Sequence, residues 1–321
     1  MATAAVKSPW HEGELEAQRR AGVDPAYPAR VAPFLRPWLN EQHQEFYPEL
    51  PFVIAGALDD AGRPWATLLQ GDPGFLQVRD ETRLHVDAEP DADDPARAGF
   101  AEGREIGLLG IQLETRRRNR LNGHVARDGD PGFDVVVDRA YGNCPKYITT
   151  HELQWTPPQP RPAELRDGLD DEARATIAAA SSFYIASHAG IEHGGVDVSH
   201  RGGRPGFVAV DGDWLIVPDF QGNQFFNTLG NLLVEPRAGL LFVDFANGDL
   251  LQLTGTAEVL YDSPLLARFA GAQRGFRVRV ERLVLRRGVL AWRGDPLDPS
   301  PALARTDTWA DLRAREAAAR T

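Results

Sequence analysis

A run of hydroxyl, imidazole, guanidinium and glycine residues in the second half of the sequence has the chemistry of an anion site. The run reads Asp197-Val-Ser-His-Arg-Gly-Gly-Arg-Pro-Gly-Phe207. Backbone N–H groups around a glycine pair, beside the Ser199 hydroxyl and the Arg201 guanidinium, are groups that bind phosphate. Taken alone, the run is also compatible with a solvated turn. We interpret it as a polar loop.

A second polar run follows closely, from Asp219 to Asn231, and reads Asp-Phe-Gln-Gly-Asn-Gln-Phe-Phe-Asn-Thr-Leu-Gly-Asn. It combines amide, hydroxyl and aromatic side chains, which suit a flat heteroaromatic ligand with a polar edge. The alternative for this run is a solvated turn or a helix cap. The presence of both runs in one half of the chain favours a binding site.

The first half offers a basic segment and the single cysteine. In Thr115-Arg-Arg-Arg-Asn-Arg120, the residues Arg116, Arg118 and Arg120 would share one face of a strand. They either protect a solvated edge strand or reach a phosphate or an anionic substrate such as a nicotinamide nucleotide. Cys144, in Asn143-Cys-Pro-Lys146, is either a small buried hydrophobe or a thiol activated by Lys146. For Cys144 we favour a positioning role.

Other common kinds of active site lack their signatures. The eight histidines include no HExxH pair, one cysteine cannot build a Cys-rich metal site, and no GxSxG segment is present. We therefore expect no metal site and no serine hydrolase.

The two halves repeat each other at a constant offset of 132 residues. Pro73-Gly-Phe75 aligns with Pro205-Gly-Phe207, and Gly107-Leu-Leu109 aligns with Gly239-Leu-Leu241, without a gap. Chance similarity between glycine-rich hairpins is the alternative explanation. The constant offset across separated clusters favours a true internal repeat.

The repeat also predicts that only one half binds an anion. Ser199 and Arg201 align with Thr67 and Leu69, so the first half lacks the cation. We therefore expect one ligand per chain, in the second half.

Four prolines in Thr156–Pro162 divide the chain, because prolines prevent a helix and remove strand donors. We predict a first domain over residues 1–155, a semi-rigid linker over 156–169 and a second domain over 170–321. Each domain begins with a helix, at about 39–49 and 170–180, the latter capped by Asp170. Short strands separated by turns then predict a barrel or sandwich in each half.

Composition narrows the classes of partner. Hydrophobic residues make up 42% and charged residues 25%, which is typical of a globular chain, and the formal net charge is −11. This charge disfavours nucleic acid and anionic membranes as partners. No apolar segment approaches about 18 residues, and we expect a cytoplasmic protein.

Three segments of the second half together resemble split-barrel flavin-binding proteins related to pyridoxamine 5′-phosphate oxidase. They are the Ser-His-Arg-Gly-Gly run, the Gly222-Asn223…Asn227-Thr228…Asn231…Pro236 pattern and the Leu-Leu-Phe-Val-Asp-Phe245 strand. Asn143-Cys-Pro-Lys146 is similar to a motif of the same superfamily. The resemblance implies a mainly β (α+β) fold of two tandem FMN-binding split β-barrels, six strands each, with peripheral helices. The substrate motifs of the vitamin B6 enzyme are not seen, so its activity is not implied.

The resemblance also implies a function and a set of cofactor-binding residues. The expected activity is an FMN-dependent oxidoreductase that uses a small-molecule electron donor or acceptor, NAD(P)H among them. The alternative is a non-catalytic protein that binds flavin, deazaflavin or haem. A homodimer is expected, with a monomer as the alternative, and no catalytic side chain is assigned. The expected cofactor-binding residues are Ser199, His200, Arg201, Gly202, Asn223, Thr228, Asn231, Arg116, Arg118, Asn143, Cys144 and Lys146.

Overall fold

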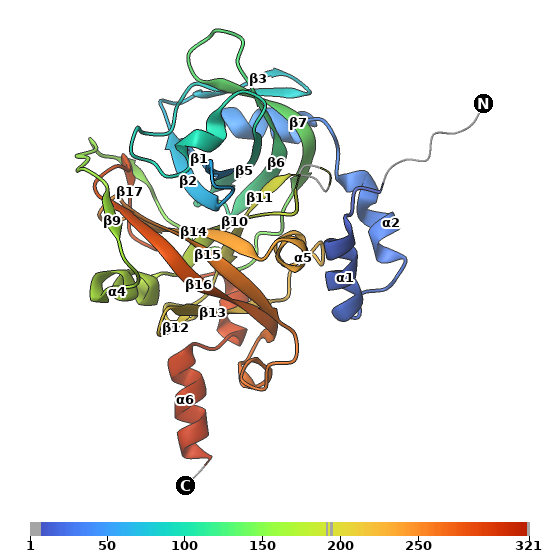
Figure 1. Ribbon diagram of the computed structural model, residues 1–321, viewed down its shortest axis with the longest axis vertical. Helices are drawn as coiled ribbons and strands as arrows, with labels where there is room; N and C mark the ends of the chain where they lie inside the picture. Colours follow the sequence, from blue (N-terminus) through green and yellow to red (C-terminus); the bar gives the residue numbers. More distant parts are fainter. Residues whose placement is uncertain (1–7, 191, 193–194, 320–321) are drawn as a thin grey trace.

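The chain folds into two antiparallel β-sheets with a few peripheral helices. The computed structural model describes residues 8–190, 192 and 195–319 (Figure 1). The fold is therefore mainly β, as the sequence predicts.

The first sheet is formed by residues before the proline-rich segment. Its strand order is β2-β1-β5-β6-β7-β4-β3, and every pair in it is antiparallel. The strands are β1 (Phe52–Leu58), β2 (Pro64–Gln70), β3 (Leu76–Asp80), β4 (Arg83–Val86), β5 (Glu105–Gln112), β6 (Arg117–Ala126) and β7 (Phe133–Gly142).

The second sheet repeats this order as β11-β10-β14-β15-β16-β13-β12, with β9 (Glu164–Arg166) added on β16. The repeat extends to the register, because a β-bulge follows Asn122 in β6 and Thr254 in β15, 132 positions apart. The internal repeat predicted from the sequence is thus visible in the strand pairing. The strands are β10 (Ser182–His188), β11 (Val196–Gly202), β12 (Ala209–Asp211), β13 (Trp214–Phe220), β14 (Arg237–Asp244), β15 (Asp249–Leu260) and β16 (Ala272–Arg286).

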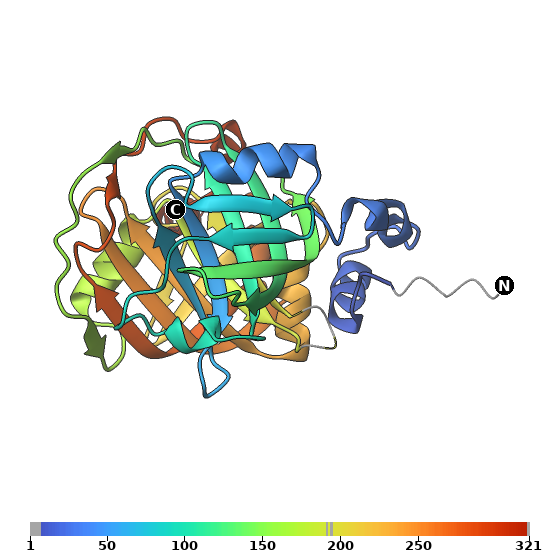
Figure 2. The same cartoon turned by 90° about the horizontal axis from the view of Figure 1, so that it is seen from above.

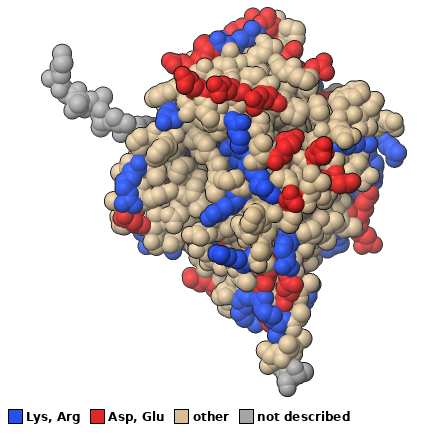
Figure 3. All heavy atoms as spheres, turned by 180° about the vertical axis from the view of Figure 1, so that it is seen from behind, with Lys and Arg blue, Asp and Glu red and all other residues tan. Residues whose placement is uncertain are grey.

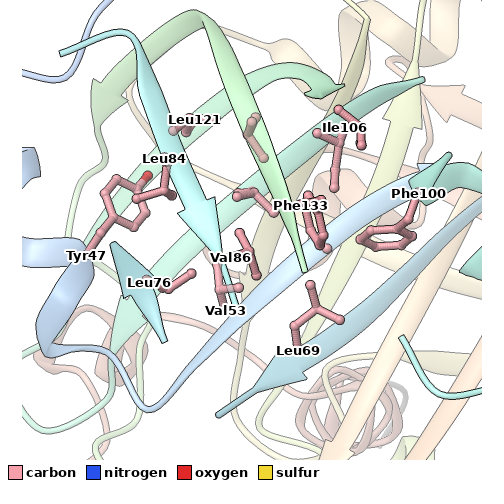
Figure 4. Packing of buried hydrophobic residues seen from close by; sticks show 14 of the residues in the cluster. Tyr47, Val53, Leu69, Leu76, Leu84, Val86, Phe100, Ile106, Leu121 and Phe133 are labelled. Carbon is pink, nitrogen blue, oxygen red and sulfur yellow. The ribbon is translucent and has the colours of Figure 1, made fainter. Parts of the chain in front are cut away.

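Each sheet encloses its own apolar core, and a third core joins the two. Figure 4 shows the first core, to which Tyr47, Val86 and Phe133 contribute from different elements. The joining core brings Ile54 of β1 together with Tyr184 of β10. Burial of this shared apolar surface holds the two sheets against each other.

The helices lie around the sheets. Asp170 caps α4 as predicted, because its carboxylate accepts a hydrogen bond from the Ala173 N–H at 2.8 Å. The helix expected at 39–49 is α3 followed by a 3₁₀ turn. The helices are α1 (Glu12–Arg20), α2 (Tyr27–Val31), α3 (Glu41–Phe46), α4 (Asp171–Ala179), α5 (Asn227–Val234) and α6 (Trp309–Ala318), with 3₁₀ turns at Ala32–Phe34, Tyr47–Glu49, Arg97–Phe100, Leu266–Arg268 and Pro301–Arg305.

The segment expected as a semi-rigid linker, 156–169, is attached to the second sheet. Its residues Glu164–Arg166 form strand β9, and the backbone N–H groups of Gln159 and Arg161 donate to the carbonyls of Gly288 and Arg287. Extended backbone leaves N–H and C=O groups free, and the end of β16 supplies partners for them. Residues 156–169 form no helix, as their prolines lead us to expect.

Both ends of the chain cross to the opposite half. The first-half helix α1 packs on α5 of the second half, and Figures 1 and 2 show it at one side of the molecule. Near the other end, β17 (Trp292–Arg293) pairs with β8 (Gln154–Trp155) of the first half. The two halves are therefore tied together at both ends.

The surface carries both signs of charge. On the face shown in Figure 3, Lys and Arg lie across the middle, whereas Asp and Glu gather toward the end opposite the C-terminus. Within the described ranges, no helix is both long and apolar enough to cross a membrane.

Candidate functional site

A pocket lies where the two halves meet, and one chain supplies both of its walls. It encloses about 960 Å³ of empty space, part of which is open to solvent. The first half contributes the first residues of β6 and the segment after β7, and the second half contributes β11, the end of β13 and the first turn of α5. Ten of the residues predicted from the sequence line it: Arg118, Asn143, Cys144, Lys146, Ser199, His200, Arg201, Gly202, Asn223 and Thr228.

Two predicted residues do not line the pocket. The Arg116 side chain donates to the carbonyls of Ile148 and Asp298, both at 2.9 Å, because a left-handed backbone (φ 60°) turns this residue out of the strand. Asn231 lies one turn further along α5, where its amide contacts His11 and Ser187, each at 3.0 Å.

The run interpreted as a polar loop is largely a strand, so that interpretation was wrong. Residues Val196–Gly202 form β11, which pairs with β10 along its length. The polar side chains of β11 are buried, with Ser199 and His200 each 7% exposed. A strand can carry them because the facing half supplies their hydrogen-bond partners.

Arg120 is the centre of that cross-half network. Its Nη2 donates to Ser199 Oγ at 2.6 Å, and its Nη1 donates to Tyr141 Oη at 2.9 Å and Asn227 Oδ1 at 3.0 Å. Asp197 Oδ1 lies 3.1 Å from the same Nη1. Burial alone would lower the pKa of Arg120, but Asp197 and Tyr141 outweigh it and the pKa is raised. This arginine is a fixed cation whose counter-ion is Asp197.

The Ser199 hydroxyl is also committed to the network. It accepts from Thr228 Oγ1 at 3.0 Å as well as from Arg120, and Asp197 Oδ2 lies 3.4 Å away. The network therefore fixes the walls of the pocket before any ligand arrives.

Arg118, two residues earlier on β6, is paired very differently. Its Nε donates to the Cys144 carbonyl at 2.7 Å, and no carboxylate of the described residues lies within ion-pair distance. Burial and the neighbouring Arg120 lower the pKa of Arg118 to about 10. Its guanidinium therefore faces the pocket as a cation that lacks a counter-ion.

A second cationic group lies on β11 itself. Arg201 Nη1 donates to Asp219 Oδ1 at 2.5 Å, and Arg274 Nε lies 4.0 Å from the other oxygen of that carboxylate. The pKa of His200 is well below its ordinary value because the ring is buried and faces Arg118 and Arg201. His200 is therefore neutral at physiological pH.

Several buried polar atoms at the pocket have no partner within the described part of the chain. They are His200 Nδ1, Arg201 Nε, Arg120 Nε and Asn143 Oδ1. Buried polar atoms are nearly always hydrogen-bonded, so a group of them around one pocket indicates that a polar ligand belongs there.

The amino-terminal end of α5 opens into the same pocket. Its N-cap, Phe226, has a left-handed backbone (φ 62°), and no side chain caps the helix. An uncapped helix terminus presents free N–H groups and a partial positive charge, which suits an anion.

Backbone strain is concentrated at this end of the pocket. Of the four non-glycine residues with positive φ in the described chain, Tyr147, Gln224 and Phe226 line it. The C-terminal segment supports Tyr147, because Ser300 Oγ accepts from its backbone N–H at 3.2 Å. Strain of this kind persists where the surroundings enforce it, and it is common at binding sites.

Gly202 is required by a close approach of the two halves. A Cβ at this position would lie 1.9 Å from the Tyr147 carbonyl oxygen. Any side chain at Gly202 would therefore push apart β11 and the segment after β7, which form opposite walls of the pocket.

The equivalent location in the other half is filled by the protein itself. The strand registers place Thr67 and Gln252 where the pocket has Ser199 and Arg120. Between them lies the buried carboxylate of Asp94, which accepts from the Thr67 hydroxyl, from Gln252 Nε2 at 3.3 Å and from Arg286 Nη1 at 2.7 Å. An internal carboxylate and its arginine thus occupy the related location.

Sequence reasoning missed several residues of the site. Arg120 was grouped with its neighbours but not chosen, although its place two residues from Arg118 put both on one face. Asn227 lay inside the second polar run without an assigned role. Tyr141 and Asp197 become functional only through contacts across the halves, which no local pattern could reveal.

The described residues contain no group of three His, Cys, Asp or Glu side chains that could hold a metal ion. The arrangement has the chemistry to hold a flat, anionic ligand between two fixed walls. It places no acid–base pair beside an evident reaction centre.

The second half of the chain matches a known family. Residues 169–292 match the family model described as pyridoxamine 5′-phosphate oxidase. The resemblance noted from the sequence is thereby confirmed, and the matched range contains β10 to β16 and α5. None of the curated proteins matches the chain.

Solved structures of similar proteins cover about two fifths of this chain. A putative pyridoxamine 5′-phosphate oxidase from Lactobacillus delbrueckii is 16% identical over 37% of this chain and 94% of its own, with a TM-score of 0.31. A FAD-binding protein from Mesorhizobium loti is 15% identical over 39% and 96%, with a TM-score of 0.27. HupZ from Group A Streptococcus is 15% identical over 36% and 91%, with a TM-score of 0.29. At these scores the likenesses carry no argument about function.

Proposed function

We propose that the chain binds one FMN in the pocket between its halves and acts as an FMN-dependent oxidoreductase. The observation that carries this proposal is Arg118, a cation without a counter-ion beside the uncapped terminus of α5. A phosphate monoester supplies the charge that both features lack. The match of residues 169–292 to the pyridoxamine 5′-phosphate oxidase family supports a flavin as the ligand.

The residues of the pocket divide into two roles under this proposal. Arg118, Lys146 and the first turn of α5 would hold the phosphate, with Arg201 and His200 supplying further polar contacts. Arg120, Ser199 and Asp197 would hold the walls in place. The flavin itself supplies hydride or electron transfer when bound, so the protein needs only to bind, orient and shield it.

The two sheets would then be tandem split barrels that act as an internal pair. One barrel of such a pair covers the flavin of the other, and the shared core between the sheets favours this arrangement. One site per chain is expected, because Asp94 and Arg286 fill the related location. The homodimer stays a prediction, which the mass of the protein in solution would test.

A second candidate ligand is haem, in a protein without catalytic activity. The observation that favours it is His200, a neutral imidazole with a buried and unpartnered Nδ1 in the pocket wall. Neutral imidazole is a common axial ligand of haem iron.

Spectroscopy separates these candidates. The purified chain would be titrated with FMN, riboflavin and haemin, and flavin bands at about 450 nm would be compared with a haem band at about 400 nm. FMN should bind in a ratio of one per chain and more tightly than riboflavin, and anaerobic addition of NAD(P)H should bleach the flavin bands. Equal affinity for FMN and riboflavin would refute the phosphate assignment.

A matched pair of variants tests the role of Arg118 directly. Arg118→Met should weaken FMN binding and leave riboflavin binding nearly unchanged, because only FMN carries the phosphate. Arg117→Met removes an exposed charge from the neighbouring position and serves as the control. Retention of full FMN affinity in Arg118→Met would contradict the proposal.

A further inference from the structure

The N-terminal arm, residues 8–35, packs against the outside of the pocket wall. A Cβ on Gly13 would lie 2.2 Å from the Gly230 carbonyl oxygen, so α1 and α5 cross at close range. The Tyr27 hydroxyl donates to the Asn223 carbonyl at 2.5 Å, on the loop that leads into α5. The arm is therefore in direct contact with the segment that the ligand would touch from the inside.

One carboxyl group of this arm is buried where α1 meets α5. Glu14 is 1% exposed, and its Oε1 accepts from Asn227 Nδ2 at 2.6 Å. Its Oε2 accepts from the backbone N–H of His11 at 3.1 Å, within the capping box of α1. Asn227 is the first residue of α5 and lines the pocket.

These contacts determine how the Asn227 amide is oriented. Because the Glu14 carboxylate is an acceptor, the NH₂ group of Asn227 faces it and donates to it. The amide oxygen of Asn227 must then face Arg120 and Tyr141. Both of those side chains donate to it, at 3.0 and 3.1 Å. The reversed amide would place NH₂ against a guanidinium, which only donates.

We propose that Glu14 is a positioning residue of the pocket: it orients Asn227 toward Arg120, and it takes up a proton when an anion binds at the amino-terminal end of α5. This inference rests on the proposed function, because the anion that binds at α5 is the phosphate of FMN. Glu14 acts through Asn227 and has no contact with the ligand itself.

The charges around Glu14 make proton uptake favourable. Burial raises the pKa of Glu14 to about 7, with Asp197 of β11 adding to the rise, while Arg139 of β7 and the His11 and Asn227 hydrogen bonds oppose it. The His11 ring on α1 lies 3.7 Å from Glu14 Oε2, and Arg120 of β6 is the next cation, behind Asn227.

An anion at the first turn of α5 adds negative charge near Glu14, which favours its neutral form. By linkage, the factor by which the anion strengthens proton binding to Glu14 is also the factor by which protonation of Glu14 strengthens anion binding. The affinity for the anion therefore falls as pH rises through the pKa of Glu14. The expected factor is on the order of tenfold.

Two substitutions at Glu14 separate positioning from simple support of the fold. Glu14→Gln keeps an oxygen that accepts from Asn227 but cannot ionise, whereas Glu14→Ala removes the acceptor. Glu12→Gln is the matched control, because it removes an exposed charge from the first turn of the same helix. All would be full-length chains whose thermal unfolding is checked first.

Dissociation constants for FMN and riboflavin would be measured between about pH 6.5 and 8.5, where a phosphate monoester is mostly the dianion. FMN affinity should fall about tenfold over this range in the natural chain and in Glu12→Gln, but stay constant in Glu14→Gln. Riboflavin affinity should not change with pH through Glu14. Glu14→Ala should bind FMN more weakly than Glu14→Gln at every pH.

Two results would overturn the inference: the same pH dependence in the natural chain and in Glu14→Gln, or equal FMN affinity in the Ala and Gln variants. If the natural chain binds no flavin, the proposed function fails, and sulfate becomes the probe because its charge is constant over this range. Sulfate should then raise Tm more at low pH in the natural chain and equally at both pH values in Glu14→Gln. An equal or absent effect of sulfate in both chains would overturn the inference.

Discussion

Glu14 should make the stability of the ligand-free protein depend on pH in a calculable way. Its pKa is raised by burial from 4.5 to about 7. A raised pKa in the folded state means that stability is full below the unfolded value and is lost as pH rises through the folded value. Between about pH 4.5 and 7, this single carboxyl should therefore cost the fold about 3 kcal/mol.

Glu14→Gln removes that loss, because the amide is neutral at every pH. The variant should be slightly less stable than the natural chain at about pH 5, since its NH₂ group faces the His11 N–H, at a cost of about 1 kcal/mol. By about pH 8 the order should reverse, and the difference between the two chains should have moved by about 3 kcal/mol in favour of the variant.

The assay is urea unfolding of both chains between about pH 5 and pH 8, followed by tryptophan fluorescence. Other groups also make stability depend on pH in this range, including His43, whose pKa burial lowers from 6.5 in the unfolded chain to about 4. A lowered histidine pKa costs stability as pH falls below 6.5, but equally in both chains, so it cancels in the difference. A difference in unfolding free energy that stays constant with pH would refute the reasoning.

Three further outcomes test the site. Arg120→Met should destabilise the fold by about 3–5 kcal/mol in urea unfolding, because Asp197 is left buried without its cation; a loss below about 1 kcal/mol would contradict the network. Arg201→Ala should weaken FMN binding by about 2 kcal/mol, as loss of a charge-assisted hydrogen bond would; an unchanged dissociation constant in a fluorescence titration would remove Arg201 from the phosphate site. Calorimetric titration should saturate at one FMN per chain, because Asp94 fills the related location; saturation at two would contradict that assignment.

The repeat and many of the strands could be predicted because they depend on local pattern. The constant offset of 132 residues relates β5 to β14 and β6 to β15. The pairing of β5 with β6 has the same register as the pairing of β14 with β15. Strand β1 has such a pattern, because its apolar residues follow a proline and precede a turn.

The polar strand β11 could not be recognised in the same way. Its residues Asp197, Ser199 and Arg201 read as a loop because buried strands are normally apolar. They are tolerated there because Arg120 of the other half pairs with Asp197, and Asp219 of β13 pairs with Arg201. That compensation depends on the packing of distant segments, which the local pattern does not contain.

The helix α1 and its role were missed for a related reason. Its hydrophobic pattern is weak, because the contact with α5 is made by Gly13 and Ala17, whose small size permits a close crossing. Asn231 was placed in the site because the family resemblance implied it. Only the docking of His11 against it shows that this amide belongs to the helix crossing.

The exchange of the two chain ends between the halves has a consequence for synthesis on the ribosome. The hydrogen bond between Glu14 and Asn227 can form only after Asn227, 213 residues later in the chain, has been synthesised. At about 5–20 residues per second, that delay is roughly 10–40 s. The hydrogen bond between Tyr147 and Ser300 likewise needs a residue that is 153 positions downstream. During this interval the surface of α1 around Gly13 lacks α5, the helix that it packs against in the folded chain. The pocket can be completed only after Gln273 of β16, which also lines it, has left the exit tunnel.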